Sequence, residues 1–232
     1  MKEIIPGFQK SLFSGASDSI PDIAEFGIDG ILSEGILKDF PFVSTLMGVK
    51  NIAQNLYDRN LLRQTLAFIK ELNNGQLDEK KKEKYRKRIE DDPKKAEAEL
   101  GRILIILNKN IDIEKSAILA CLFRSYISET STWDEFCDYA EIVDRLFLSD
   151  LKHLRKVYEH DIKKDDYMIN SSIYSANRLS SLGLISTTRV ADFYRKNYNM
   201  EYVVRLTTCG KKFCTIINSY LCHSTGQRSV KS

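Results

Sequence analysis

Over residues 1–160, apolar side chains recur at steps of three and four, which is the spacing of one face of an α-helix. The clearest run predicts one long helix from Val43 to Asn73, ended by Asn73-Asn74-Gly75. No strand pattern appears before residue 180, so we expect a helical bundle over residues 1–160. The apolar positions of the long helix are Leu46, Val49, Ala53, Leu56, Leu62, Leu66 and Ile69.

Residues that favour helix ends divide the rest of this region into shorter helices. Asp92 followed by Pro93 predicts a helix start, because Asp caps the first turn and Pro is tolerated at the first helical position. Thr132, with Glu135 three residues later, forms a capping box. The helix that follows Asp112 is apolar on nearly every side, so we expect it to be the central helix of the bundle.

A glycine-rich hairpin is predicted at residues 17–43, with the turn at Pro41. Each of Gly27, Gly30 and Gly35 weakens an isolated helix by about 1 kcal/mol, so close packing has to compensate. A tightly packed helical pair is the first interpretation, and insertion into a bilayer or a partner is the alternative. Five carboxylates argue against stable membrane insertion: Asp22, Glu25, Asp29, Glu34 and Asp39.

The periodicity changes after residue 160. Ile173, Ala176 and Leu179 share a helical face, and Gly183 is placed for the left-handed turn that ends a helix. Residues 184–188 are strand-like, and 202–206 form the clearest β-branched and aromatic run. Thr207 or Thr208 can cap a last helix, 210–220. We therefore expect a mainly α protein, in which a small winged-helix-like α+β module over residues 161–232 follows the bundle.

Two short motifs carry a resemblance within this module. Leu182-Gly183-Leu184-Ile185 and the later Leu206-Thr207-Thr208-Cys209-Gly210 occur in the order helix, strand, wing, strand and helix. That layout resembles a winged helix of the MarR type. DNA-reading winged helices place two further helices before the recognition helix. Here only residues 150–160 are available, so the module is one helix short or needs the N-terminal part to complete it.

Positive charge is concentrated towards the C-terminus. From Ser171 onward there are nine basic and two acidic residues, so this part carries +7 and residues 1–170 carry −4, within a total of +3. A basic module predicts nucleic acid or another polyanion as partner; the alternative is that the charges only confer solubility. The candidate anion-binding residues, placed at the recognition helix, the wing and its returning strand, are Arg178, Arg189, Arg195, Lys196 and Arg205.

A second basic run lies at residues 80–88 and holds seven basic side chains against one acidic. Such runs bind phosphates or anionic lipid headgroups. A solvated helix is the favoured interpretation, because Leu77, Tyr85 and Ile89 supply a thin apolar face. The basic residues are Lys80, Lys81, Lys82, Lys84, Arg86, Lys87 and Arg88.

The search for catalytic and metal-binding patterns yields none, so we predict a non-enzymatic protein without cofactor or metal. Five scattered cysteines without a Cys-x-x-Cys pair indicate reduced, mostly buried thiols in a cytosolic protein. Cys209, Cys214, Cys222 and His223 do not follow a common zinc spacing. No signal peptide and no apolar run of about 18 residues is evident, so membrane contact without spanning is the most that we expect.

A second resemblance concerns function. Residues 35–43, the Asp58-Arg59-x-Leu-Leu step, and the two C-terminal motifs are similar to uncharacterised bacterial proteins of the abortive-infection alpha type. The resemblance implies a non-enzymatic binding or regulatory protein in phage defence and transfers no functional residue. One alternative is a winged-helix transcription regulator that reads bases near Ser172, Ser175, Asn177 and Arg178. The other is a membrane-active effector that uses the glycine-rich hairpin, and a protein partner is also compatible with the pattern.

Overall fold

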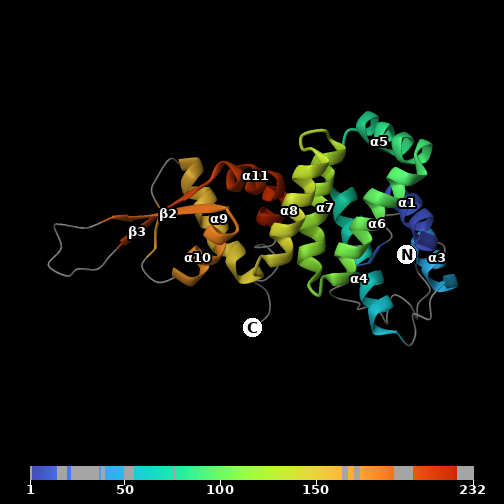
Figure 1. Ribbon diagram of the computed structural model, residues 1–232, viewed down its shortest axis with the longest axis horizontal. Coiled ribbons are helices and arrows are strands. Elements are labelled where there is room, and N and C mark those ends of the chain that lie inside the picture. Colours follow the sequence, from blue (N-terminus) through green and yellow to red (C-terminus); the bar gives the residue numbers. More distant parts are fainter. Residues whose placement is uncertain are drawn as a thin grey trace. The chain divides into compact units, whose positions relative to one another are not determined.

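The protein is mainly α-helical, with a small antiparallel sheet in its C-terminal part, as the sequence predicts (Figure 1). Two compact units divide the chain, Met1–Ala140 and Glu141–Ser232. The boundary lies earlier than the expected one at residue 160, because α9 (Leu148–Lys163) packs against helices and strands of the second unit. The computed structural model describes residues 2–14, 20–21, 37, 40–49, 55–75, 77–163, 167–169, 173–190 and 201–223.

The first unit is built from packed helices, with the helix after Asp112 at its centre as predicted. That helix, α7, buries ten of its fifteen residues and packs most extensively against α4. Helix α8 begins in this unit and ends in the second. The described elements are the 3₁₀ turn Lys2–Ile4, α1 (Ile5–Leu12), α3 (Pro41–Val49), α4 (Leu56–Asn74), α5 (Glu79–Asp91), α6 (Pro93–Lys109), α7 (Ile113–Ile127) and α8 (Trp133–Arg145).

A chain of aromatic rings runs through this core. Phe8 of α1 contacts Phe42 of α3 and Phe68 of α4, with ring centroids 5.8 and 6.1 Å apart. Phe68 contacts Phe123 of α7 at 5.8 Å, and Phe123 contacts Phe136 of α8 at 5.6 Å. All five side chains are fully buried. Because aromatic side chains bury the largest apolar areas, this chain of contacts joins five helices that lie far apart in sequence.

The prediction of one long helix from Val43 to Asn73 is wrong. The structure has two helices there, α3 and α4, and α4 begins afresh at Leu56. The side chain of Asn55 accepts a hydrogen bond from the backbone N–H of Tyr57 at 3.0 Å and so caps the new helix. Leu56, counted in the apolar stripe, is 78% exposed. The apolar positions continue at helical spacing past Asn55, so the spacing alone does not reveal that Asn55 starts a new helix.

Other predicted helix ends are confirmed. The Asp92 side chain accepts from Lys95 N at 3.1 Å, and Pro93 occupies the first position of α6. In the capping box, Glu135 N donates to Thr132 Oγ1 at 3.1 Å, and Thr132 N donates to the Glu135 carboxylate at 2.9 Å. Most of the glycine-rich hairpin, residues 15–19 and 22–36, lies outside the described residues.

The second unit joins three helices to a three-stranded antiparallel sheet in the order β1-β3-β2. The returning strand β3 is central and pairs Ile185 with Leu206 on one side and Tyr167 with Val204 on the other. Strand β1 was not predicted, because three residues are too few to show an alternating pattern. The elements after α9 are β1 (Tyr167–Ile169), α10 (Ile173–Ser181), β2 (Ile185–Val190), β3 (Glu201–Leu206) and α11 (Thr208–His223).

Only residues 170–172 separate β1 from α10, so the helix that a DNA-reading winged helix places at this point is missing here. Among the described residues, no helix combines the length and the apolar character needed to cross a bilayer.

Candidate nucleic-acid interface

The two motifs of the C-terminal module meet in space and form one structural clasp. The Thr207 hydroxyl donates to the Gly183 carbonyl at 2.5 Å and accepts from Gly210 N at 2.9 Å, so Thr207 is the predicted cap of α11. The Thr207 N–H donates to the Leu184 carbonyl at 3.1 Å. A Cβ atom at position 210 would lie 1.8 Å from that same carbonyl oxygen, so only glycine fits. The clasp fixes the base of the β2–β3 hairpin against α11.

Gly183 has φ +72°, the left-handed conformation predicted for the end of α10. The chain therefore reverses directly from α10 into β2, and the Leu184 N–H closes the turn on the Leu179 carbonyl at 3.1 Å. This turn sets the angle between α10 and β2.

A buried carboxylate anchors α10 to α9. Asp150 is only 1% exposed and accepts hydrogen bonds from Arg178 Nε at 2.7 Å, from Arg178 Nη2 at 2.5 Å, and from the Ser175 hydroxyl. Burial opposes ionisation of Asp150, but the hydrogen bonds from Arg178 and Ser175 outweigh it and hold its pKa below the ordinary value. The hydrogen bonds to Asp150 raise the pKa of Arg178, whose guanidinium also lies 4.8 Å from the centre of the Phe147 ring.

These contacts define which predicted residues of α10 face outward. Ser175 is buried by the Asp150 anchor, and Arg178 directs two of its nitrogens to that carboxylate. Asn177 is exposed, and Ser172 lies outside the described residues. Tyr174, which is not among the residues predicted from the sequence, is 77% exposed. Tyr174 and Asn177, three residues apart, therefore form the outward face of this helix.

The β2–β3 hairpin carries the remaining candidates. Arg205 is exposed on β3 and pairs in register with Ser186. Arg189 lies in β2 opposite Tyr202, although its side chain is outside the described set. Arg195 and Lys196 fall between the two strands, at 191–200, which also lies outside the described residues. Within the described residues the hairpin thus brings Arg189 and Arg205 into one two-stranded ribbon.

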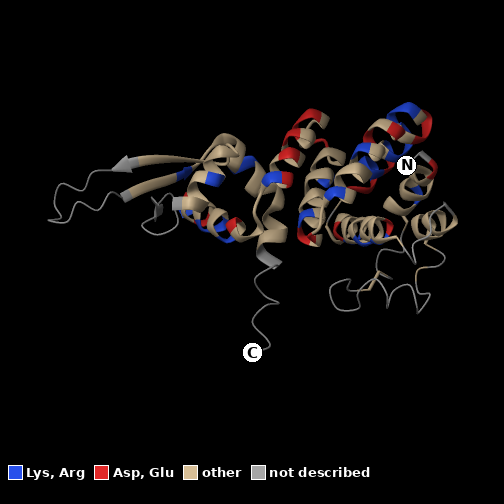
Figure 2. Ribbon diagram, turned by 60° about the horizontal axis from the view of Figure 1, so that its bottom comes forward, with Lys and Arg blue, Asp and Glu red and all other residues tan. Residues whose placement is uncertain are grey.

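The charge asymmetry persists across the structural division, although it is smaller than across residue 171. Residues 141–232 contain fifteen Lys and Arg against nine Asp and Glu, a net charge of +6, which leaves −3 for residues 1–140. Figure 2 shows how Lys and Arg (blue) and Asp and Glu (red) are distributed over the described helices. On α9, Lys152 and Lys156 are exposed at a spacing of four and share one face. Their spacing was the signal by which the sequence could have included them among the candidates.

The second basic run is docked by its own charges. Lys81 Nζ donates to the Ser128 carbonyl at the end of α7, Lys84 pairs with Glu129 at 2.5 Å, and Arg88 Nη2 donates to the Tyr126 hydroxyl at 2.7 Å. A cation at a helix C-terminus is favoured, because the last carbonyl groups are unsatisfied. The inner face of α5 therefore uses its positive charges to hold α5 on α7.

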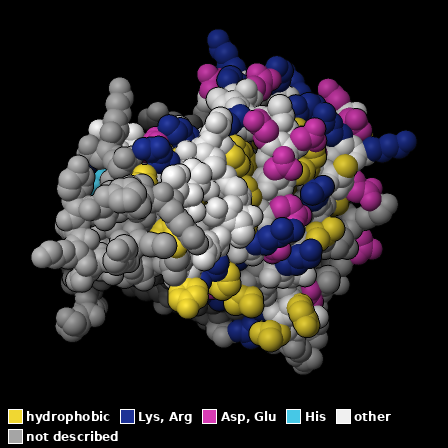
Figure 3. All heavy atoms as spheres, turned by 60° about the vertical axis from the view of Figure 1, so that its left-hand side comes forward, with side chains coloured by type: hydrophobic (Ala, Val, Ile, Leu, Met, Phe, Trp, Pro, Cys, Tyr) yellow, Lys and Arg dark blue, Asp and Glu magenta, His cyan; other side chains and the backbone are white. Residues whose placement is uncertain are grey.

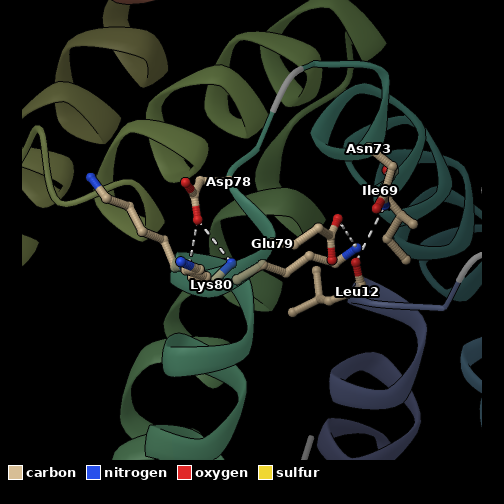
Figure 4. A network of polar contacts seen from close by, with 8 residues as sticks. Leu12, Ile69, Asn73, Asp78, Glu79 and Lys80 are labelled. Atoms are coloured by element: carbon tan, nitrogen blue, oxygen red, sulfur yellow. Dashed lines mark hydrogen bonds and ion pairs between the residues drawn. The ribbon is translucent and has the colours of Figure 1, made fainter.

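The outer face of α5 mixes both signs of charge. Figure 3 shows basic and acidic side chains interspersed on the described part of one face of the molecule. Glu83 pairs with Arg86 at 3.0 Å and with Lys87 at 3.8 Å, while Lys82 pairs with Glu79 at 3.4 Å. Figure 4 shows the start of this helix, where Asp78 caps α5 by accepting from the backbone of Lys80 at 2.8 Å. Six of the seven predicted basic side chains thus have a partner inside the unit.

A buried carboxylate also joins α5, α6 and α7. Glu99 accepts hydrogen bonds from the hydroxyl groups of Tyr85 at 2.9 Å and Tyr126 at 2.7 Å. Burial and the neighbouring Glu99 raise the pKa of both tyrosines. The guanidinium of Arg88 lies over both rings, at 4.8 and 5.1 Å from their centres. The cluster thus ties α5, α6 and α7 together.

Two of the cysteine thiols are buried. Burial raises the pKa of the Cys121 thiol to about 11 and that of Cys214 to about 12, so both are protonated and weakly nucleophilic at neutral pH. Within the described ranges no group of three His, Cys, Asp or Glu side chains is placed to hold a metal ion.

Comparisons with protein-family models, with curated proteins and with solved structures found no match for this chain.

Proposed function

We propose that this chain is a non-enzymatic binding or regulatory protein whose C-terminal unit binds nucleic acid, and that it acts in bacterial phage defence. The observation that carries the proposal is that the positive charge coincides with the structural division, at +6 for residues 141–232 and −3 for residues 1–140. Lys and Arg that neutralise phosphates supply most of the affinity for a nucleic-acid backbone. The scattered cysteines favour a reducing, cytoplasmic setting.

The shape of the unit supports the same proposal. Arg205 is exposed on a two-stranded ribbon, which can follow a phosphate backbone without reading any base. Register places Arg189 on the opposite face of that ribbon. The ten residues 191–200, which include Arg195 and Lys196, connect the two strands of that ribbon. In this proposal the hairpin provides the phosphate contacts, and the Leu184–Thr207 clasp holds it in place.

A winged-helix transcription regulator is the second candidate, favoured by the outward face of α10. Tyr174 and Asn177 are exposed there, and amide side chains are suited to adenine in the major groove. The helix missing between β1 and α10 argues against this mode, because the helix that crosses the DNA backbone is then absent.

Salt-dependent binding tests the proposal. Anisotropy of labelled duplex and single-stranded DNA, from about 50 to 300 mM salt, should show affinity that falls steeply as salt rises. Replacing Arg195 and Lys196 by alanine should flatten the log–log slope by about two units, because each neutralised phosphate contributes roughly one. Lys80→Ala/Lys87→Ala is the matched control, since it removes the same charge from exposed positions of α5.

Three results contradict the proposal. Absence of binding to either DNA at about 50 mM salt removes the nucleic-acid partner. An equal loss of slope in the Lys80/Lys87 control shows that only total charge matters. Nucleotide turnover that persists after the protein is purified a second time would show that the protein is an enzyme. The defence role is tested by plating phages on cells that express the chain, where the Arg195/Lys196 variant should lose protection.

A further inference from the structure

Two aromatic side chains of the second unit are exposed beside the same arginine. Phe147, in the link between α8 and α9, is 57% exposed, and Tyr174, in α10, is 77% exposed. The Arg178 guanidinium lies 4.8 Å from the centre of the Phe147 ring. Arg178 also follows Tyr174 by one helical turn, so the two side chains are neighbours on one face of α10. Phe147, Tyr174 and Arg178 therefore form one surface cluster, which we call the aromatic patch.

The buried Asp150 carboxylate holds this patch in position. Arg178 donates to it through Nε at 2.7 Å and through Nη2 at 2.5 Å, so the plane of the guanidinium is fixed. The Phe147 ring in turn packs on that guanidinium, although more than half of the side chain stays open to solvent. A ligand that covers a ring held in this way loses little conformational entropy on binding, because the ring is already ordered.

One nitrogen of Arg178 remains available to a ligand. Nε and Nη2 contact Asp150, and Nη2 also contacts the Ser175 hydroxyl at 3.3 Å, whereas Nη1 has no hydrogen-bond partner among the described residues. The side chain is 38% exposed, so solvent reaches it. Guanidinium groups are well suited to phosphate oxygens. The patch thus places a hydrogen-bond donor for phosphate next to open aromatic surface, in a unit whose net charge of +6 attracts polyanions.

We propose that the aromatic patch binds unpaired bases of a single-stranded nucleic acid. Bases stack on Phe147 and Tyr174, and Arg178 Nη1 donates to a phosphate of the same strand. Stacking on a side chain requires an open base face, which a single strand presents and a duplex hides between neighbouring base pairs. The inference rests on the proposed function, because it assumes a nucleic-acid partner, and it adds the form of the nucleic acid that this surface recognises. The stacking chemistry is common to single-stranded DNA and RNA.

Strands that differ only in their bases test the proposal on the full chain. Anisotropy compares labelled oligothymidylate of about twelve nucleotides with an abasic strand of equal length, which has the same phosphates and no base to stack. Oligothymidylate should bind roughly tenfold more tightly than the abasic strand, with the same dependence on salt. Oligouridylate of equal length shows whether RNA is bound as well as DNA.

Substitution of the two rings separates stacking from charge. Phe147→Ala and Tyr174→Ala should each weaken oligothymidylate binding by roughly tenfold, while binding of the abasic strand and of a duplex stays within about twofold. The log–log salt slope should not change, because no phosphate contact is lost. Tyr57→Ala is the matched control, since Tyr57 is 74% exposed but lies in α4 of the first unit. Tyr174→Ala leaves the Phe147–Arg178 contact in place, so it tests stacking even where Phe147→Ala loosens the start of α9.

The possible failures are distinguishable. Equal, salt-dependent binding of oligothymidylate and the abasic strand overturns the stacking inference and leaves the proposed function standing. Unchanged oligothymidylate affinity in Tyr174→Ala, or an equal loss in Tyr57→Ala, also overturns the inference alone. Absence of binding to every strand and to the duplex at about 50 mM salt overturns both.

Discussion

Replacing Gly210 with alanine should destabilise the second unit selectively. The new Cβ would lie 1.8 Å from the Leu184 carbonyl oxygen, so α11 or the start of β2 has to move by more than an ångström to reach ordinary contact. Overpacking of this kind costs about 1–3 kcal/mol, and weakening the hydrogen bonds of Thr207 costs about 1 kcal/mol more. Higher helix propensity of alanine returns about 1 kcal/mol, which leaves a net loss near 2 kcal/mol.

Hydrogen exchange read by mass spectrometry can assign this loss to the correct unit. Peptides from α11 and β2 should lose protection in Gly210→Ala, whereas Trp133, the single tryptophan, should report unchanged unfolding of the first unit. Gly48→Ala is the matched control: it lies in α3 with nothing within 4 Å of the added Cβ, so it should be neutral or stabilising.

Equal protection of α11 in Gly210→Ala and in the unaltered protein would refute the close approach of α11 to Leu184. Loss of protection spread evenly over both units would also refute the reasoning, because the steric conflict is confined to residues of the second unit.

Three further predictions use the same measurements. Asp150→Asn should weaken the second unit at pH 7 and reduce its acid sensitivity: the folded pKa is lowered, so the stabilisation is present above the unfolded value of about 3.9 and is lost as pH falls through the folded value. An unchanged acid transition by circular dichroism contradicts this. Tyr126→Phe should cost about 1–2 kcal/mol in Trp133-detected unfolding, because contacts with Glu99 and Arg88 are lost; an unaltered midpoint counts against it. Cys121, with its raised pKa of about 11, should be alkylated roughly 100-fold more slowly than exposed Cys209, and equal rates by mass spectrometry would exclude a buried thiol.

Local chemistry determined those parts of this fold in which neighbouring residues decide the outcome. Helix caps at Asp92 and Thr132 could be read directly, because the donor and the acceptor lie within three residues of each other. Gly183 could be read in the same way, since a left-handed turn requires a residue without a side chain. The helix around Cys121 was identified as central because burial on every side leaves no polar face.

The tertiary structure alone decided which residues meet. Arg178 was selected as a phosphate contact, but only the fold brings Asp150 within hydrogen-bonding distance of it, from a separate helix. Strand β1 exists because β3 offers it a partner, since three residues carry no pattern of their own. Spacing along a chain describes the faces of single elements, whereas a site requires side chains from several elements at one point, and only packing sets that point.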